Sequence, residues 1–224
     1  MFLGSTEIGK AYLGNNLVFD KGGEPAPGQT IKTNYLIYGS PTIDGNSYIP
    51  NLSSKGFIYT DEPFAPAAGS SWIIQTRLKL NSSNAWRDIW ATVDSTGAFV
   101  RKFTTQFNTY DSNKRYVFYL SSNGTGWNVL NAKCPGQMQP NVWYKFQLVC
   151  TYTGAGYQFK QGYPDRDSWT SVSNVSSYVP INCHVAFGGG AGGTCIDAEF
   201  DLSETKIFID GSLWWEAITD LTSN

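Results

Sequence analysis

The 224 residues carry a formal net charge of −2 at pH 7, and Lys and Arg are scattered rather than gathered into the basic stripe that nucleic-acid binding needs. No apolar run approaches the ~20 residues of a membrane span. Aromatic residues make up 15% of the chain, and strand and turn formers outnumber helix formers, so we expect an all-β protein.

The opening stretch, MFLGSTEIGKAYLGNNLVFDKGG, does not have the pattern of a secretory signal, because Glu7, Gly9 and Lys10 interrupt any apolar run. It contains a short repeat, Phe2–Ile8 and Tyr12–Val18, in which an aromatic residue and Leu precede Gly and two small polar residues. Gly and Asn favour tight turns, so the repeat predicts strands near residues 1–3, 8–13 and 17–19.

So small a meander is barely stable alone. We therefore expect residues 1–20 either to dock on a larger assembly or to pack as a hairpin on the chain's own domain. The residues expected to make the docking contacts are Phe2, Leu3, Ile8, Tyr12, Leu13 and Val18. Residues 21–33 are predicted to be a linker, since Lys21–Gln29 contains three Gly and two Pro. The main domain is expected to span residues 34–224.

The main domain has the residue pattern of successive strands. Apolar and polar residues alternate in Ile74–Leu80 and in Trp143–Cys150, and Asp210-Gly211 inside Lys206–Trp215 predicts a hairpin turn. Further predicted strands are Arg87–Val93, Phe99–Phe107, Arg115–Ser121, Tyr157–Gln161 and His184–Phe187. Short strands at this spacing indicate two packed β-sheets. Trp72, Trp143 and Trp215 fall inside these strand patterns and are expected in the core.

The four cysteines, Cys134, Cys150, Cys183 and Cys195, form no C-x-x-C pair, which argues against a zinc site. Their number allows two disulfides. The lack of a secretory pattern favours folding in a reducing cytoplasm, so we expect free and mostly buried thiols. The single histidine, His184, excludes a histidine cluster within one chain and is expected along a strand edge.

Three blocks of the sequence carry a family resemblance: Phe64–Leu80, Trp143–Trp169 and Ile196–Trp215. Together they resemble the concanavalin A-like lectin/glucanase superfamily, in the laminin-G-like form found in bacteriophage virion proteins. The resemblance covers residues 50–218 and implies a jelly-roll β-sandwich. It also implies that residues 1–20 are a virion-docking element, because the opening repeat is similar to N-terminal segments of phage structural proteins.

The stretch Glu199-Phe200-Asp201-Leu202-Ser203-Glu204 resembles the Glu-x-Asp-x-x-Glu signature of retaining β-glucanases. On a strand, positions 199, 201 and 203 share a face, and a bulge is needed to bring Glu204 onto it. Two carboxyl groups about 5–5.5 Å apart would then act as nucleophile and acid/base. The following hairpin instead matches the non-catalytic lectin-like pattern, in which Phe200 and Leu202 face the core and the acids face solvent. We expect no catalytic residue and keep Glu199, Asp201 and Glu204 as the alternative.

Three further tryptophans lie in polar, turn-like surroundings. An exposed indole packs on the apolar face of a sugar ring, while Asp, Asn and Arg bind hydroxyl groups. The predicted carbohydrate-binding residues are Trp86, Arg87, Asp88, Trp127, Asn128, Asp165 and Trp169. The alternative is that each Trp folds back to cap the sandwich.

These features predict a non-enzymatic virion appendage, such as a head fibre, tail or capsid decoration, that binds bacterial surface polysaccharide. We expect many copies or a homo-oligomer, contacts with other virion proteins through the N-terminal segment, and neither nucleic-acid binding nor membrane insertion. The virion is the expected location, after synthesis in the host cytoplasm. No organic cofactor is expected, and calcium stays open because relatives of the fold bind it. The alternatives are a glycoside hydrolase, a purely structural virion component, and a cellular protein with the same fold.

Overall fold

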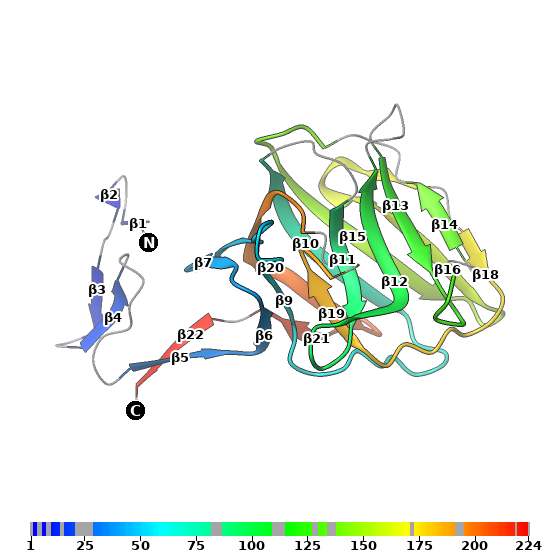
Figure 1. The fold of residues 1–224 in the computed structure, drawn as a ribbon, viewed down its shortest axis with the longest axis horizontal. Helices are drawn as coiled ribbons and strands as arrows, with labels where there is room; N and C mark the ends of the chain where they lie inside the picture. The colour runs from blue at the N-terminus through cyan, green and yellow to red at the C-terminus, as the bar shows by residue number, and fades with distance from the viewer. Residues whose placement is uncertain are drawn as a thin grey trace.

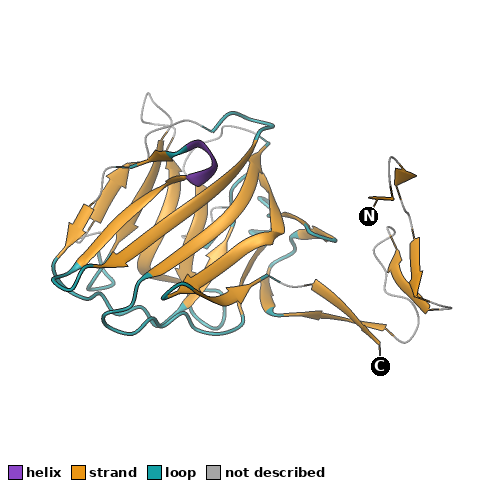
Figure 2. Ribbon diagram, turned by 180° about the vertical axis from the view of Figure 1, so that it is seen from behind, coloured by secondary structure: helices purple, strands orange, loops and turns teal. Residues whose placement is uncertain are grey.

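The computed structural model describes residues 2–3, 6–7, 10–13, 16–20, 29–81, 87–108, 115–126, 130–133, 138–170, 173–190, 195–217 and 219–223. Figures 1 and 2 show two large β-sheets packed face to face. The single helical turn of the described chain is η1 (Pro164–Arg166), and no helix in these ranges is long and apolar enough to cross a membrane. The predicted all-β sandwich is confirmed.

One sheet, here called sheet I, is antiparallel and has nine strands. Its order is β17 (Ser168–Trp169), β16 (Tyr157–Tyr163), β15 (Trp143–Tyr152), β10 (Trp72–Leu80), β20 (Ala198–Ile209), β8 (Ser47–Ile49) and β7 (Thr42–Asp44). In addition, β18 (Ser173–Val175) pairs with β16, and β21 (Ser212–Glu216) pairs with β20.

The second sheet, sheet II, has seven antiparallel strands. Its order is β14 (Leu130–Lys133), β13 (Arg115–Leu120), β12 (Phe99–Asn108), β11 (Arg87–Val93), β19 (His184–Phe187), β9 (Phe57–Thr60) and β6 (Tyr35–Tyr38). The five further strands that were predicted, from Arg87–Val93 to His184–Phe187, are all present in the two sheets. Each observed end lies within three residues of the predicted end.

The core lies between the two sheets and is rich in aromatic rings. Trp90 of sheet II stacks on Phe146 of sheet I, with ring centroids 5.0 Å apart, and Phe187 stacks on Trp215 at 5.4 Å. The predicted alternation is confirmed in β15, where Tyr144, Phe146, Leu148 and Cys150 are buried and the residues between them are not. Trp72 and Trp215 are core residues, as predicted.

The predicted Asp210-Gly211 turn joins β20 to β21. Asp210 has φ 49° and Gly211 has φ 80°, so both central residues are in the left-handed region that a tight two-residue hairpin turn requires. The Asp210 carboxylate also accepts a 2.8 Å hydrogen bond from the Ser71 amide. The turn thereby ties β20 to the start of β10.

The chain enters and leaves the sandwich at one corner (Figure 1). There β5 (Gln29–Thr33), the last part of the stretch predicted as a linker, pairs antiparallel with β22 (Thr219–Ser223) to form a two-stranded ribbon. At its root the Asn34 side chain donates to the Glu216 carbonyl at 2.5 Å, and Trp215 Nε1 donates to the Asn34 carbonyl at 2.9 Å. The two strands of the ribbon are therefore fastened together where they meet the sandwich.

Before the ribbon, β1 (Phe2–Leu3) pairs with β2 (Thr6–Glu7), and β3 (Lys10–Leu13) pairs with β4 (Asn16–Asp20). Five of the predicted docking residues lie in these strands, and Ile8 lies outside the described residues. The repeat therefore forms two short hairpins. Whether they dock on a partner stays a prediction.

Cys150, Cys183 and Cys195 are free thiols and are buried, as expected, and Cys134 lies outside the described residues. Burial raises the pKa of Cys150 to about 12 and that of Cys183 and of Cys195 to about 11.

His184 does not lie on a strand edge as expected. It belongs to β19, between β11 and β9, and its buried Nδ1 lies 2.6 Å from the Thr60 carbonyl.

Candidate functional site

The outer face of sheet I, which points away from sheet II, carries a continuous set of polar side chains. Side chains alternate between the two faces of a sheet along each strand. In β10, β15 and β20, the residues that lie between the buried ones therefore project outward. This surface is called the polar face here. Its central residues are Gln75, Arg77, Lys79, Trp143, Lys145, Gln147, Glu199, Asp201 and Glu204.

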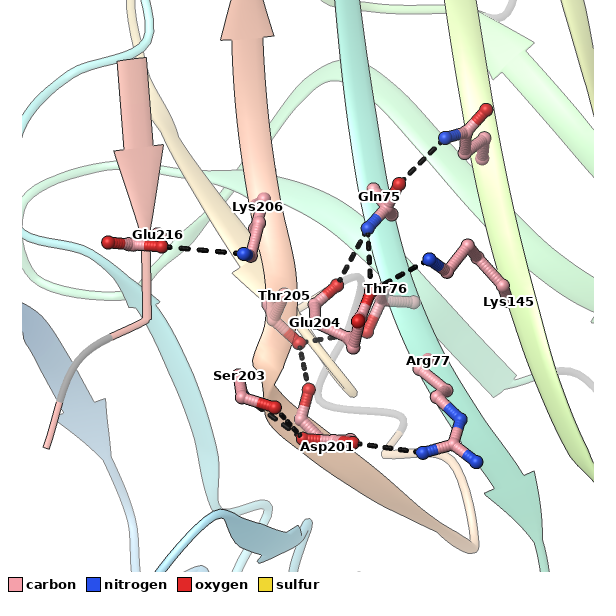
Figure 3. Close-up of polar contacts among 11 residues, drawn as sticks. Gln75, Thr76, Arg77, Lys145, Asp201, Ser203, Glu204, Thr205, Lys206 and Glu216 are labelled. Atoms are coloured by element: carbon pink, nitrogen blue, oxygen red, sulfur yellow. Dashed lines mark hydrogen bonds and ion pairs between the residues drawn. The ribbon is translucent and has the colours of Figure 1, made fainter. Parts of the chain in front are cut away.

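Ion pairs connect these strands. Lys79 Nζ lies 2.5 Å from Glu199 Oε2, and Arg77 Nη1 lies 3.1 Å from Asp201 Oδ2. Lys145 Nζ lies 2.9 Å from Glu204 Oε2. Figure 3 shows the last two pairs with a fourth, in which Lys206 Nζ and Glu216 Oε2 are 3.6 Å apart. Each of the three acids of the Glu-x-Asp-x-x-Glu stretch therefore has its own cation.

A bulge in β20 brings Glu204 onto this face. Arg77 of β10 pairs with Asp201 of β20, but Gln75, two residues earlier on β10, pairs with Lys206. The single residue Thr76 therefore lies opposite residues 202–205. Thr205 Oγ1 donates to the Asp201 carbonyl at 2.9 Å and lies 3.0 Å from Thr76 Oγ1, which closes the bulge (Figure 3). The bulge that the glucanase-like alternative requires is therefore present.

The environment of the acids does not favour hydrolysis. A retaining mechanism needs one carboxylic acid that holds a proton and one free carboxylate. The hydrogen bond from Lys79 lowers the pKa of Glu199, and the Ser47 hydroxyl adds a second donor at 2.9 Å. Glu204 accepts from Gln75 Nε2 at 3.1 Å as well as from Lys145. Both glutamates are thus paired with a lysine side chain, Glu199 with Lys79 and Glu204 with Lys145.

Trp143 lies on the polar face and not in the core, so its expected burial is wrong. The inward positions of β15 are taken by Tyr144 and Phe146, and the alternation turns Trp143 outward, where it is half-buried. The guanidinium carbon of Arg77 lies 4.9 Å and Lys79 Nζ 5.0 Å from the centre of its ring. Trp143 is therefore held in place by cation–π contacts.

Trp169 lies on the same face of the same sheet. It pairs with Gly162, which in turn pairs with Gln147 of the polar face. A Cβ at Gly162 would lie 2.8 Å from the Trp169 Cα, so glycine permits this close approach. Lys160 Nζ lies 4.2 Å from the Trp169 ring centre, and the ring is half-buried. Asp165, another predicted contact residue, is exposed in η1 just before β17.

Two of the remaining predicted sugar contacts, Arg87 and Asp88, are not brought together with Trp169. Arg87 and Asp88 belong to β11 of sheet II, not to a loop. The Asp88 side chain is fully buried and accepts hydrogen bonds from Thr104 Oγ1 at 2.9 Å and Gln106 Nε2 at 2.8 Å. Trp86, Trp127 and Asn128 lie outside the described residues.

Sequence reasoning missed the cations that surround the two outward tryptophans, namely Arg77, Lys79 and Lys160. The alternation in Ile74–Leu80 puts Arg77 and Lys79 on the face opposite Leu78, but the strand order that brings them beside Trp143 is not visible in the sequence. Among the described residues, no group of three or more His, Cys, Asp or Glu side chains could hold a metal ion. Calcium binding therefore stays untested.

The comparisons with known proteins support the fold. No protein-family model matches the chain, and no curated protein matches it. Among solved structures, the Emp46p carbohydrate recognition domain in its metal-free form has a TM-score of 0.56 and 12% identity, over 80% of this chain and 88% of that one. The Emp47p carbohydrate recognition domain has a TM-score of 0.56 and 10% identity, over 79% and 87%.

The VIP36 exoplasmic/lumenal domain, in a Ca2+/Man2-bound form, has a TM-score of 0.53 and 13% identity, over 85% of this chain and 90% of that one. Similarity at this identity concerns the path of the chain and the arrangement of its strands. This chain therefore has the concanavalin A-like jelly-roll fold that the sequence resemblance implied.

Proposed function

We propose that the sandwich is a carbohydrate-binding domain whose polar face takes a polysaccharide and does not cleave it. The observation that carries this proposal is the placement of Trp143 and Trp169 on one face of sheet I. Indole rings at two points offer apolar platforms for sugar rings, and the polar side chains of the same face offer hydrogen bonds to hydroxyl groups. Solved neighbours of this fold that are named as carbohydrate recognition domains add support.

Polar groups on the same face as the two tryptophans are already fixed in position. Gln147 Nε2 donates to Gln75 Oε1 at 2.7 Å, and Gln75 in turn donates to Glu204. Side chains that are ordered before the ligand arrives lose less conformational entropy when they bind it. This preorganisation favours recognition of a repeating sugar chain by a flat surface.

The same contacts make hydrolysis the less favoured function. Lys79 and Lys145 hold the two glutamates as ion pairs, whereas a general acid must carry a proton at working pH. The bulge at residues 202–205 is the one feature that favours a hydrolase, and it keeps that alternative worth testing.

We further propose that the domain is displayed by a virion as an appendage that attaches to bacterial surface polysaccharide. The opening repeat, with its two short hairpins, is suited to add strands to another protein. Binding at a single open face is weak, and many copies on one particle make it effective. The proposal rests on the two short hairpins, on the open polar face, and on the resemblance of the opening repeat to N-terminal segments of phage structural proteins.

The test is to incubate the full chain with a panel of capsular and cell-wall polysaccharides, and to record retention and released reducing ends together. Trp169→Ala and Trp143→Ala should each weaken retention. Tyr152→Ala, at the far end of β15 with an exposed ring, should not. Released sugar that disappears in Glu199→Gln would replace the proposal with a hydrolase, and no retention on any glycan would leave a structural role.

A further inference from the structure

A row of apolar side chains crosses the outer face of sheet I. Residues directly opposite each other on neighbouring strands share a face of the sheet. Ile73 of β10 pairs with Val149 of β15 and with Phe208 of β20, and Phe208 pairs in turn with Leu213 of β21. Ile73 and Val149 alternate with the buried residues of their strands, as the residues of the polar face do. These four residues are called the apolar stripe here.

The apolar stripe lies outside the core. Leu213 is 48% exposed, and the other three side chains are half-buried. Among the described residues, the partly buried apolar side chains that pack on the core include no member of the stripe. The stripe therefore does little to hold the two sheets together, and its apolar surface is available to a ligand.

A polar row borders the stripe on one side and contains one of the two outward tryptophans. Along β15, β10 and β20 it lies two residues away from the stripe, a distance of about 7 Å. Its members, opposed across β17, β16, β15, β10 and β20, are Trp169, Gly162, Gln147, Gln75 and Lys206. A ligand that rests on Trp169 and bonds to the two glutamines therefore lies beside the stripe.

The stripe is only one residue wide. On its other side, two positions beyond the stripe residues, the chain has Thr151, Ser71 and Asp210, which are all polar. A stable protein interface buries about 800 Å² on each partner, and four side chains in a single row offer far less. A single extended polymer chain, laid across strands about 4.8 Å apart, matches a row of this width.

The charges of the polar face favour a neutral polymer. Every cation of β10, β15 and β20 belongs to one of the four ion pairs described above, so positive and negative charges alternate over the face. An anionic polymer would lie as close to the carboxylates as to the cations, and the attraction and the repulsion would largely cancel. An uncharged chain disturbs none of the pairs.

The stripe is mainly aliphatic, which indicates what it contacts. Val149, Ile73 and Leu213 lack the flat π face on which an indole receives a sugar ring. Aliphatic side chains instead bury small apolar groups, and the small apolar groups that project from sugar rings are methyl groups. They occur in 6-deoxy sugars and in acetyl substituents.

We propose that the apolar stripe receives the methyl groups of a neutral polysaccharide that contains 6-deoxy or acetylated sugars, while the neighbouring polar row binds the hydroxyl groups of the same chain. This inference rests on the function proposed above and names the class of polymer that the polar face takes. Trp169 supplies affinity for sugar rings in general, and the stripe supplies the preference for methylated ones.

Two matched pairs of ligands test the preference and separate the two sources of the methyl group. The first pair is partly acetylated glucomannan and the same polymer after removal of its acetyl groups with alkali, compared by affinity electrophoresis of the full chain. The second pair is beads that carry 6-deoxy-D-galactose and beads that carry D-galactose. The methyl-bearing member of at least one pair should bind about fourfold more tightly for each methyl group buried. Equal binding within both pairs would overturn the proposal.

Val149→Thr and Ile73→Thr test the stripe itself. Each puts a hydroxyl group in the row while keeping a β-branched side chain, and each should lower the ratio of affinities within the preferred pair. Ile37→Thr, at a 51% exposed position of β6 in sheet II, is the matched control and should leave the ratio unchanged. A ratio that survives in both stripe variants would contradict the assignment of the methyl contact to this row.

Trp169→Ala separates this inference from the proposed function. It should weaken binding of both members of a pair and leave their ratio intact. Binding that needs Trp169 but ignores methyl groups would overturn the inference and keep the proposed function, whereas retention of no glycan would overturn both. Sedimentation of the wild type and of Ile73→Thr/Val149→Thr is the last control. A wild-type dimer that the double variant abolishes would assign the stripe to a second copy of the chain and overturn the inference.

Discussion

Lys145 and Glu204 form a 2.9 Å ion pair across two strands that are not neighbours, β15 and β20, with β10 between them. The bulge in β20 makes this reach possible because it brings Glu204 toward Gln75 (Figure 3). Without the bulge, Glu204 would not reach across β10, so the ion pair depends on the bulge. It also involves Glu204, one of the two glutamates of the glucanase-like alternative.

Lys145→Met should lower the free energy of unfolding by no more than about 1 kcal/mol, because both side chains are about one third exposed and water screens their attraction. Urea denaturation of the wild type and the variant measures this. A loss of several kcal/mol would mean that the pair holds the bulge together.

Glu199 should make stability depend on acid pH. Its pKa is lowered in the folded state, with Lys79 as the largest cause, so its contribution is present above the unfolded value near 4.5 and is lost as the pH falls through the folded value. Urea midpoints of the wild type and of Glu199→Gln should therefore differ at pH 7 and converge below pH 4.5. A difference that is constant down to pH 3, or that grows in acid, would contradict the assignment.

Gly211→Ala should destabilise the protein by about 1–2 kcal/mol, since a Cβ is unfavourable in the left-handed region. Gly211 has φ +80° and an added Cβ would meet no atom within 4 Å, so the backbone conformation is the whole cost. Gly126→Ala is the control, because it has equal space and no positive φ. Thermal unfolding of the two variants should separate them clearly, and equal melting temperatures would mean that the turn relaxes.

The buried thiols should be inert in the native protein. With pKa values of about 12 for Cys150 and about 11 for Cys183 and Cys195, few are ionised at pH 8, and none of the three is accessible. In a Cys134→Ser variant, an aromatic disulfide reagent should label no thiol before denaturation and three afterwards. Fast labelling of the folded variant would show that the sandwich opens locally.

The sequence could predict the long strands because their alternation is strong. The inward residues of β10 and β15 and the Asp210-Gly211 turn follow from local pattern alone. The four short strands between Tyr35 and Thr60 were not identified, because each has only three or four residues and turn residues separate them.

The candidate site was less predictable. The alternation that buries Tyr144 already implies that Trp143 faces outward, so the error came from taking a place inside a strand pattern as evidence of burial. The pairing of Lys145 with Glu204 and of Lys160 with Trp169 depends on the strand order of sheet I. Strand order is a tertiary property that no local pattern encodes.

The ribbon of β5 and β22 has a mechanical consequence for the sandwich that it carries. A single extended chain swivels freely, whereas two hydrogen-bonded strands resist both bending and torsion. Because Asn34 and Glu216 are hydrogen-bonded at the root of the ribbon, the tilt of the sandwich relative to the ribbon is restricted. If ribbons of several copies were fixed side by side on one surface, their polar faces would point in a common direction, and a long polymer could lie across several of them.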